Sequence, residues 1–447
     1  MWPRIACLLI IGYLSMSRSF AYLGVPAWKL FISEVVFALL LLFGPKILSR
    51  RWLSVVLKLP AMGRFHCWYG LFLAYGIAEV FLGIHAGYPP LTVIRDLAFN
   101  YYPLYFFLGL WAGLVRPDLL PRVIRGFAWF NGIYGVLYIL FLNRLDWFMP
   151  GVSDEVAPVP IFGQPIYSFV ALLGLLAYEK SVSRNWHLWL LNGFVMLGMQ
   201  IRGEWVAFVV GVVIWGVLAR QGKRVAQAGV VLASLLAVMY FTDFHLPSPQ
   251  GRTEADFTAK QLVDRGLAPF RADVSDQKAA AGLGGADSQE ATFVFRTVWW
   301  MAIWDSVHAD LRTAALGYGY GFPLGDLVPY LEGEFIRTPH NTFFYALGYT
   351  GWIGVVLFTL FQFAILRLLW DAYRIDGEPF GIILWATMLI YSLATAFFEV
   401  PYGAIPFYLL AGCACAPLCC EQVCVRIATK KPFNGSQLSA GVPEAAG

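Results

Sequence analysis

Long apolar runs alternate with short polar stretches along most of the chain. A helix needs about 20 mostly apolar residues to cross the hydrocarbon core of a bilayer. We therefore expect an all-α polytopic membrane protein with about twelve transmembrane helices. The apolar runs are 4–22, 28–44, 66–84, 91–115, 121–142, 163–179, 186–201, 203–219, 225–242, 341–369, 379–398 and 402–420.

One long polar segment, residues 243–340, separates the ninth run from the tenth. Its first part, 247–292, is rich in Gly, Ala, Asp and Gln and is expected to be flexible. Residues 293–311 show a helical pattern that is dense in aromatic side chains. Tryptophan favours the headgroup level of a membrane, so we expect this helix to lie at the interface. Its tryptophans are Trp299, Trp300 and Trp304.

These runs divide the chain into four regions. Residues 1–242 are expected to hold nine transmembrane helices, 243–340 the long loop, and 341–420 three further helices. Residues 421–447 read as a disordered tail, because small and polar residues dominate it. The first run could instead be a signal peptide, with Ser19, Phe20 and Ala21 resembling a cleavage site. The uncleaved span is favoured because the apolar run continues through Tyr22 and Leu23.

The composition agrees with a membrane protein. The chain has 447 residues, of which 59% are hydrophobic and only 13% are charged, with a mean hydropathy of +0.63. Soluble domains have about 45–50% apolar and about 25% charged residues. One interior could not hide so much apolar surface, so the excess must face lipid.

The distribution of positive charge predicts the orientation. With the N-terminus in the cytoplasm, nineteen Lys and Arg residues fall on the cytoplasmic side and five in short loops on the other side. Positive charge is enriched in cytoplasmic loops. Both termini are therefore expected in the cytoplasm and the long loop outside it. The net charge of +4 thus reflects topology and gives no reason to expect nucleic-acid binding.

Cysteines and glycines add little chemistry. None of the seven cysteines lies in the long loop, so no disulfide framework is expected there. Five lie late in the chain without a CxxC pair, and a membrane helix explains them better than a metal site. The stretch GYGYG, residues 317–321, follows no strand, so we interpret it as a tight turn before the next span and not as a nucleotide site.

Four ionisable residues are expected at the outer membrane face. Such residues are costly at membrane depth and usually serve function. Each also has a plain structural explanation: a hairpin anchor, an arginine beside tryptophans, an interfacial histidine, or a helix end. The four are Arg202, Arg296, His340 and Glu399.

Together, the four residues favour an anionic headgroup beside a base. Arginine offers planar bidentate donors that suit phosphate or pyrophosphate. The N-terminus of the run 341–369 adds unpaired N–H groups and the positive end of the helix dipole. The same dipole disfavours protonation of His340. A neutral imidazole can accept a proton, as a general base must.

Four short motifs resemble the O-antigen ligase and polymerase superfamily. HNTFFYALGYTGWIGVVLF at 340–358 is similar to its His-Asn span with following glycines. RTVWWMAIWDSV and LGYGYG resemble its Arg-x-x-x-Trp helix and glycine turn. QIRGEWVAF resembles its Arg-Gly hairpin, although Ile201 stands where family members often have Ser. Their order and spacing resemble the family over roughly 160–400.

The resemblance implies a metal-independent, inverting glycosyltransferase of the bacterial inner membrane without a cofactor. Its donor would be a glycan on undecaprenyl pyrophosphate, and its acceptor another glycan or lipid A–core. Arg202 and Arg296 would hold the pyrophosphate, and His340 would deprotonate the acceptor hydroxyl. Glu399 is the nearest match to the acidic residue of the family, which is more often Asp. Asn341 and Trp300, which belong to the same motifs, are possible accessory residues.

Several functions remain open. A ligase transfers a finished glycan, whereas a polymerase transfers a growing chain to a second carrier-linked repeat. The donor site is the same, so the sequence leaves both possible, with ligase favoured slightly and protein O-glycosylation a less favoured third. A lipid-linked sugar flippase or permease predicts inverted repeats and polar groups at the midplane. Arg95 and Asp96, early in the fourth run, are the main feature that fits it. A non-catalytic scaffold would make His340 and Arg296 replaceable.

Overall fold

The computed structural model describes residues 2–25, 30–47, 60–153, 158–178, 185–243, 245–246, 257–258, 289–328 and 338–418. The described part is mostly helical. The first half contains α1 (Trp2–Ala21), α2 (Ile32–Ile47), α4 (Pro60–His85), α5 (Pro90–Asp96), α6 (Ala98–Tyr101), the 3-10 turn η2 (Tyr102–Leu104), α7 (Tyr105–Val115), α8 (Leu119–Leu140) and η3 (Leu142–Arg144). The second half contains α9 (Ser168–Tyr178), α10 (Trp186–Gly198), α11 (Arg202–Leu218), α12 (Gly222–Phe241), α15 (Gln289–Val307), α16 (Leu311–Leu316), η5 (Leu324–Leu327), α17 (Thr342–Asp376), α18 (Phe380–Ser392) and α19 (Pro401–Ala414).

Strands are few and short among the described residues. Three antiparallel hairpins connect helices and form no larger sheet. In the first, Gly24 pairs with Phe31, and in the third, His245 pairs with Thr258. Their strands are β1 (Gly24–Val25), β2 (Leu30–Phe31), β3 (Phe148–Ser153), β4 (Pro158–Pro160), β5 (His245–Leu246) and β6 (Phe257–Thr258).

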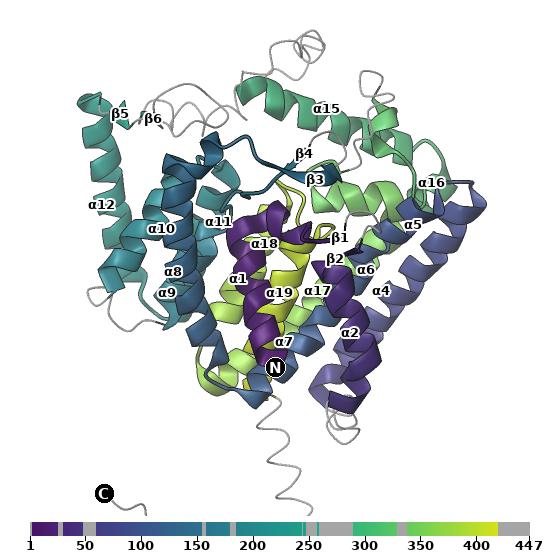
Figure 1. The fold of residues 1–447 in the computed structure, drawn as a ribbon, viewed down its shortest axis with the longest axis horizontal. Helices are drawn as coiled ribbons and strands as arrows, with labels where there is room; N and C mark the ends of the chain where they lie inside the picture. The colour runs from purple at the N-terminus through teal and green to yellow at the C-terminus, as the bar shows by residue number, and fades with distance from the viewer. Residues whose placement is uncertain are drawn as a thin grey trace, which may run out of the picture.

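Helix α19 forms the centre of the bundle together with α7 and α1. Small residues let α7 and α19 approach closely, because a Cβ on Gly109 would overlap the carbonyl oxygen of Leu409, and one on Gly412 would overlap that of Phe106. Helix α1 packs against α19, α8 and α7. Figure 1 shows the long helices running side by side, with α15 lying across their upper end.

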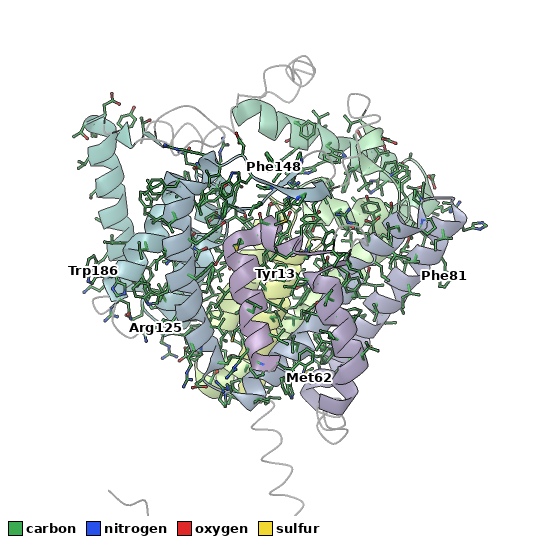
Figure 2. All side chains as sticks on the ribbon, viewed as in Figure 1. Tyr13, Met62, Phe81, Arg125, Phe148 and Trp186 are labelled. Carbon is green, nitrogen blue, oxygen red and sulfur yellow. The ribbon has the colours of Figure 1, made fainter. Side chains whose placement is uncertain are left out.

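The outer surface of the bundle carries large apolar side chains. Figure 2 places Tyr13 in the middle of the molecule, where it is fully buried, and Phe81 and Trp186 at its rim. Phe81 is 69% exposed and Trp186 is 58% exposed. Water would penalise such a surface, whereas lipid would not. The multi-pass membrane character predicted from the sequence therefore fits the packing.

Five helices in the described part of the chain are long and apolar enough to cross a membrane. They cover Trp2–Ala21, Met62–His85, Leu119–Leu140, Thr342–Asp376 and Pro401–Leu418. Ser168–Tyr178 and Phe380–Ser392 are apolar but shorter. Each of the twelve predicted runs contains helix, yet several helices are shorter than the run that predicted them.

Two predicted helices have breaks with a clear physical cause. The run 91–115 is divided into α5, α6, η2 and α7, where Pro103 lacks a backbone donor. The buried side chains of Asp96 and Asn100 bind groups on other elements beside this break. Helix α17 bends at Gly351, whose φ of 58° and ψ of −167° are not helical. Thr342–Thr350 is thus a short helix of its own, followed by the long helix from Trp352.

Candidate functional site

Helix α15 carries two of the predicted site residues four positions apart, on one face. Its central anchor is Trp299, which is fully buried and donates from its indole nitrogen to the carbonyl oxygen of Leu324 at 2.9 Å. The next residue, Trp300, points to another neighbour and donates to the carbonyl oxygen of Pro339 at 2.7 Å. Arg296, one turn earlier, is half-buried. A helix is therefore present where 293–311 predicted one, although it ends at Val307, and it touches the residue before His340.

The glycine turn 317–321 joins α15 and α16 to the short first part of α17. The backbone N–H of Tyr318 donates to Gly348, and that of Gly319 donates to Tyr349, both at 2.9 Å. Gly317 and Gly351 both have positive φ, and a Cβ on either would collide with the backbone of the other segment. These contacts agree with the predicted tight turn. They also explain why glycine stands in both motifs.

His340 itself has an unusual backbone conformation. Its φ is 52°, in the left-handed region, where a non-glycine residue costs roughly 1–2 kcal/mol. The next residue, Asn341, caps α17, since its side-chain oxygen accepts from the N–H groups of Phe343 at 2.9 Å and Phe344 at 3.3 Å. His340 is half-buried. His340 thus lies directly before the N-terminus of α17, at the positive end of the helix dipole, as the sequence predicted.

Three of the motifs meet at the segment that follows α18. The side chain of Asn341 donates to the carbonyl oxygen of Leu393 at 2.8 Å. The guanidinium of Arg296 donates to the next carbonyl oxygen, that of Ala394, at 2.9 Å. A Cβ on Gly203 would lie 3.8 Å from the Cβ of Ala394. The residue pair Leu393–Ala394 therefore binds the motifs of Arg296 and His340, and Gly203 of the Arg202 motif lies beside it.

Arg202 begins α11 directly after a sharp hairpin. Gln200 has a φ of 54°, which lets the chain reverse between Gly198 and Arg202. Arg202 is half-buried, and Gly203 packs against the ring of Tyr391. The N-terminus of α11 thus faces the end of α18, as the N-terminus of α17 does.

Glu399 lies in the loop between α18 and α19 and is buried. Its Oε2 accepts from the hydroxyl of Thr342 at 2.6 Å and from the N–H of Phe397 at 3.2 Å. Burial raises the pKa of this carboxyl from 4.5 to about 7, although these hydrogen bonds lower it. Glu399 therefore contacts the first residue of α17, two positions after His340.

The other polar pair, Arg95 and Asp96, binds further elements of the molecule. Arg95 donates to the hydroxyl of Tyr22 at 3.0 Å, and Asp96 accepts from the N–H of Gly321 at 2.9 Å. This pair supports the glycine turn and the first hairpin.

Sequence reasoning missed Thr342, Leu393 and Ala394. The last two contribute backbone carbonyl oxygens, which every residue has, so no sequence signal could have identified them.

No metal site emerges from the part of the chain that the structure describes. Within it, no group of three or more His, Cys, Asp or Glu side chains could hold an ion. Cys413 is buried and donates to the carbonyl oxygen of Gly109 at 3.1 Å. Of the five late cysteines, Cys419, Cys420 and Cys424 lie outside the described residues, as does the predicted tail 421–447.

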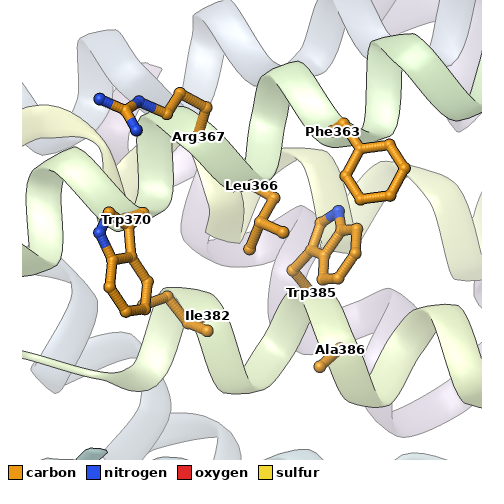
Figure 3. Close-up of a pocket in the computed structure, with 7 residues that line it drawn as sticks. All are labelled: Phe363, Leu366, Arg367, Trp370, Ile382, Trp385 and Ala386. Carbon is orange, nitrogen blue, oxygen red and sulfur yellow. The ribbon is translucent and has the colours of Figure 1, made fainter.

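An open pocket of about 510 Å³ lies between α17 and α18, away from these residues. Figure 3 shows its walls, which are almost wholly apolar, with the guanidinium of Arg367 at one end. Arg367 also pairs with Asp371 at 3.2 Å. Such a lining lacks the converging polar groups that a sugar or pyrophosphate needs. Its lining residues are Phe363, Leu366, Arg367, Trp370, Ile382, Trp385 and Ala386.

Comparison with known families now adds to this geometry. Residues 187–359 match the family model described as O-Antigen ligase. No curated protein matches the chain. The matched region contains Arg202, Arg296 and His340, whereas Glu399 lies beyond it. The predicted resemblance to the O-antigen ligase superfamily is therefore confirmed over residues 187–359.

Proposed function

We propose that this protein is a glycosyltransferase that moves a glycan from undecaprenyl pyrophosphate to an acceptor hydroxyl at the outer face of the plasma membrane. The family match supports ligase- or polymerase-type activity. The observation that carries the residue assignment is the convergence of three motifs on Leu393–Ala394. The two arginine motifs and the histidine motif lie together at this residue pair, although they are far apart in sequence.

The arginines would hold the donor. Arg296 and Arg202 each offer a planar fork of N–H donors, which matches the oxygens of a pyrophosphate. Arg202 is the first residue of α11, and Arg296 binds Ala394, beside the residue that Asn341 at the start of α17 binds. Both helix N-termini also favour an anion. As the glycosidic bond breaks, negative charge grows on the pyrophosphate oxygen. Positive groups already in place at that oxygen stabilise the transition state.

His340 would serve as the general base. A neutral imidazole accepts the proton of the acceptor hydroxyl while that oxygen forms a bond to the anomeric carbon. The bond from the anomeric carbon to the pyrophosphate oxygen breaks, and its electron pair leaves with undecaprenyl pyrophosphate. Attack from the face opposite the leaving group inverts the anomeric centre. No metal or organic cofactor takes part in this scheme, in line with the family resemblance.

Glu399, Asn341 and Trp300 would be accessory. Glu399 binds Thr342 in the first turn of α17, so its contribution would be to hold the start of that helix. Asn341 and Trp300 contact the residues around His340. None of the three needs to touch the reacting atoms.

The acceptor is either lipid A–core or another glycan, and we favour ligase-type transfer. A polymerase that extends a second carrier-linked repeat would use the same donor chemistry and is the first alternative. A flippase or permease is the alternative of another class. It receives less support, because the polar residues gather around one end of α11 and α17 and not halfway along the bundle.

This function requires a particular topology. We propose about twelve membrane spans, with 1–242 holding nine and 341–420 three, and residues 243–340 forming the extracytoplasmic loop. The aromatic helix α15 would lie at the outer interface of the inner membrane. Both termini, including the tail 421–447, would be cytoplasmic, as the positive charges favour.

A gel of surface and carrier-linked glycans tests this proposal in a strain that lacks the protein. A ligase predicts that glycan of normal length accumulates on the carrier while the acceptor stays bare. A polymerase predicts single repeats in place of the ladder. Unchanged surface and carrier-linked glycans in this strain would contradict the proposed transfer.

A further inference from the structure

The backbone at His340 needs an explanation that the proposed chemistry does not supply. Among the described residues, five non-glycine positions have positive φ: Ser17, Gln200, Arg220, Asp243 and His340. A histidine persists in this conformation only when its surroundings enforce it. Helix capping by Asn341 accounts for the start of α17 but does not require a left-handed residue before the cap.

Two side-chain hydrogen bonds enforce it, one from Trp300 of the α15 motif and one from Asn341, the residue after His340. On the N-terminal side, the indole N–H of Trp300 binds the carbonyl oxygen of Pro339 at 2.7 Å. On the C-terminal side, the amide N–H of Asn341 binds the carbonyl oxygen of Leu393 at 2.8 Å. His340 is thus held between one bond to α15 and one to the end of α18.

These two bonds restrict the direction in which the side chain of His340 leaves the backbone. A peptide unit is planar, so only φ and ψ of His340 relate the plane before it to the plane after it. Trp300 binds the carbonyl oxygen of Pro339, which belongs to the first of these planes. The side chain of Asn341, the residue after the second plane, binds Leu393 at the end of α18. With both planes held, the Cα–Cβ bond of His340 has one direction.

The same two elements, α15 and the end of α18, also hold the proposed donor-binding residue. Arg296 precedes Trp300 by one turn of α15, and its guanidinium binds Ala394, the neighbour of Leu393. Trp300 is held in turn by a parallel stack on Phe344, with ring centroids 5.5 Å apart and planes 7° apart. The base and the arginine therefore take their positions from the same two elements.

We propose that Trp300 and Asn341 are positioning residues that together hold His340 in its left-handed conformation, so that its imidazole faces the acceptor hydroxyl. This inference rests on the proposed function, because it assumes that His340 is the base. It assigns Trp300 a hydrogen-bonding role distinct from membrane anchoring, which the sequence pattern had indicated for the tryptophans of α15. A small displacement of a catalytic group is costly, since about 1 Å can reduce the rate about a hundredfold.

Trp300→Phe is the most direct variant. Phenylalanine keeps a ring against Phe344 but has no N–H for Pro339. Trp299→Phe is its matched control, because Trp299 lies next to it on α15 and also loses one indole hydrogen bond, at 2.9 Å to Leu324. Asn341→Ser is a second, independent variant. Serine still caps α17 but has no amide N–H to reach Leu393.

The experiment uses the full-length protein in proteoliposomes. The donor is the lipid-linked glycan extracted from a strain without this protein, and native membranes supply the acceptor. We expect kcat to fall between about tenfold and about a hundredfold in Trp300→Phe and Asn341→Ser. The KM for the donor should stay within about twofold, because both arginines remain. Trp299→Phe should keep the wild-type kcat, even where its melting temperature falls.

Several results would overturn the positioning role. One is a wild-type kcat in both Trp300→Phe and Asn341→Ser. Another is a loss of kcat in Trp299→Phe that equals the loss in Trp300→Phe. A parallel fall of kcat, donor affinity and melting temperature would also contradict it, since that indicates general loss of structure. His340→Ala in the same assay separates the two proposals. If His340→Ala keeps full activity, the proposed function fails. If His340→Ala is inactive while Trp300→Phe and Asn341→Ser keep wild-type activity, only the positioning role fails.

Discussion

The hydroxyl of Thr342 donates to Oε2 of Glu399 at 2.6 Å and joins the first turn of α17 to the loop before α19. The N–H of Phe397 donates to the same oxygen. The other oxygen, Oε1, is buried and has no hydrogen-bond partner among the described residues. Burial raises the pKa of this carboxyl to about 7. The carboxyl with this raised pKa therefore binds Thr342, the residue two positions after the proposed base.

Glu399→Gln should stabilise the protein more at pH 8 than at pH 5. The folded carboxyl holds its proton up to about pH 7, whereas the unfolded one loses it near 4.5. The wild type therefore loses stability as pH rises between these values, by an amount on the order of 3 kcal/mol. Glutamine does not titrate and still accepts from Thr342. Melting temperatures in detergent at both pH values check this, and a constant difference between variant and wild type would contradict it.

Gly351→Ala should destabilise the protein much more than Gly377→Ala. Both glycines have positive φ, 58° and 74°, so alanine is strained at either position. Only at Gly351 would the new Cβ also meet backbone atoms, those of Ala315 and Gly317, whereas nothing lies within 4 Å at Gly377. Thermal melting separates the two. Equal losses of stability would show that the close backbone approach contributes nothing.

Arg296→Lys should weaken donor binding by about tenfold or more while leaving the fold intact. Lysine keeps the charge but loses the bidentate fork that suits a pyrophosphate. Arg312→Lys is the control, because Arg312 is exposed on α16. Competition by undecaprenyl pyrophosphate in the transfer assay measures this affinity. A normal inhibition constant in Arg296→Lys would remove the arginine from the donor site.

The membrane class and most helix positions could be predicted from the sequence. Apolar runs long enough to span a bilayer need no knowledge of their neighbours, and α1, α4, α8 and α19 appear close to the predicted positions. The prediction overlooked the break within 91–115, although Pro103 lies in it. The contact of Asp96 with Gly321 beside this break could not be predicted, because it joins distant parts of the chain. The bend at Gly351 likewise depends on a contact with the glycine turn.

The candidate site was predictable only in part. Arg296, His340 and their neighbours stand in recognisable motifs, and the family match covers them. Their meeting point, Leu393–Ala394, uses backbone oxygens and leaves no mark in the sequence. The left-handed backbone of His340 is equally invisible, since histidine has no special preference for that conformation comparable with that of glycine.

The central claim is glycosyl transfer with His340 as the base, and reconstitution tests it most directly. The measurement follows release of undecaprenyl pyrophosphate and appearance of acceptor-linked glycan in proteoliposomes that contain only this protein. His308→Ala is the control, since His308 lies just beyond α15 and accepts from the indole of Trp352 at 3.0 Å. The account predicts matched release and transfer with wild type and His308→Ala, and a loss of about a hundredfold or more with His340→Ala. Undiminished transfer by His340→Ala, or no transfer by the wild type, would contradict it.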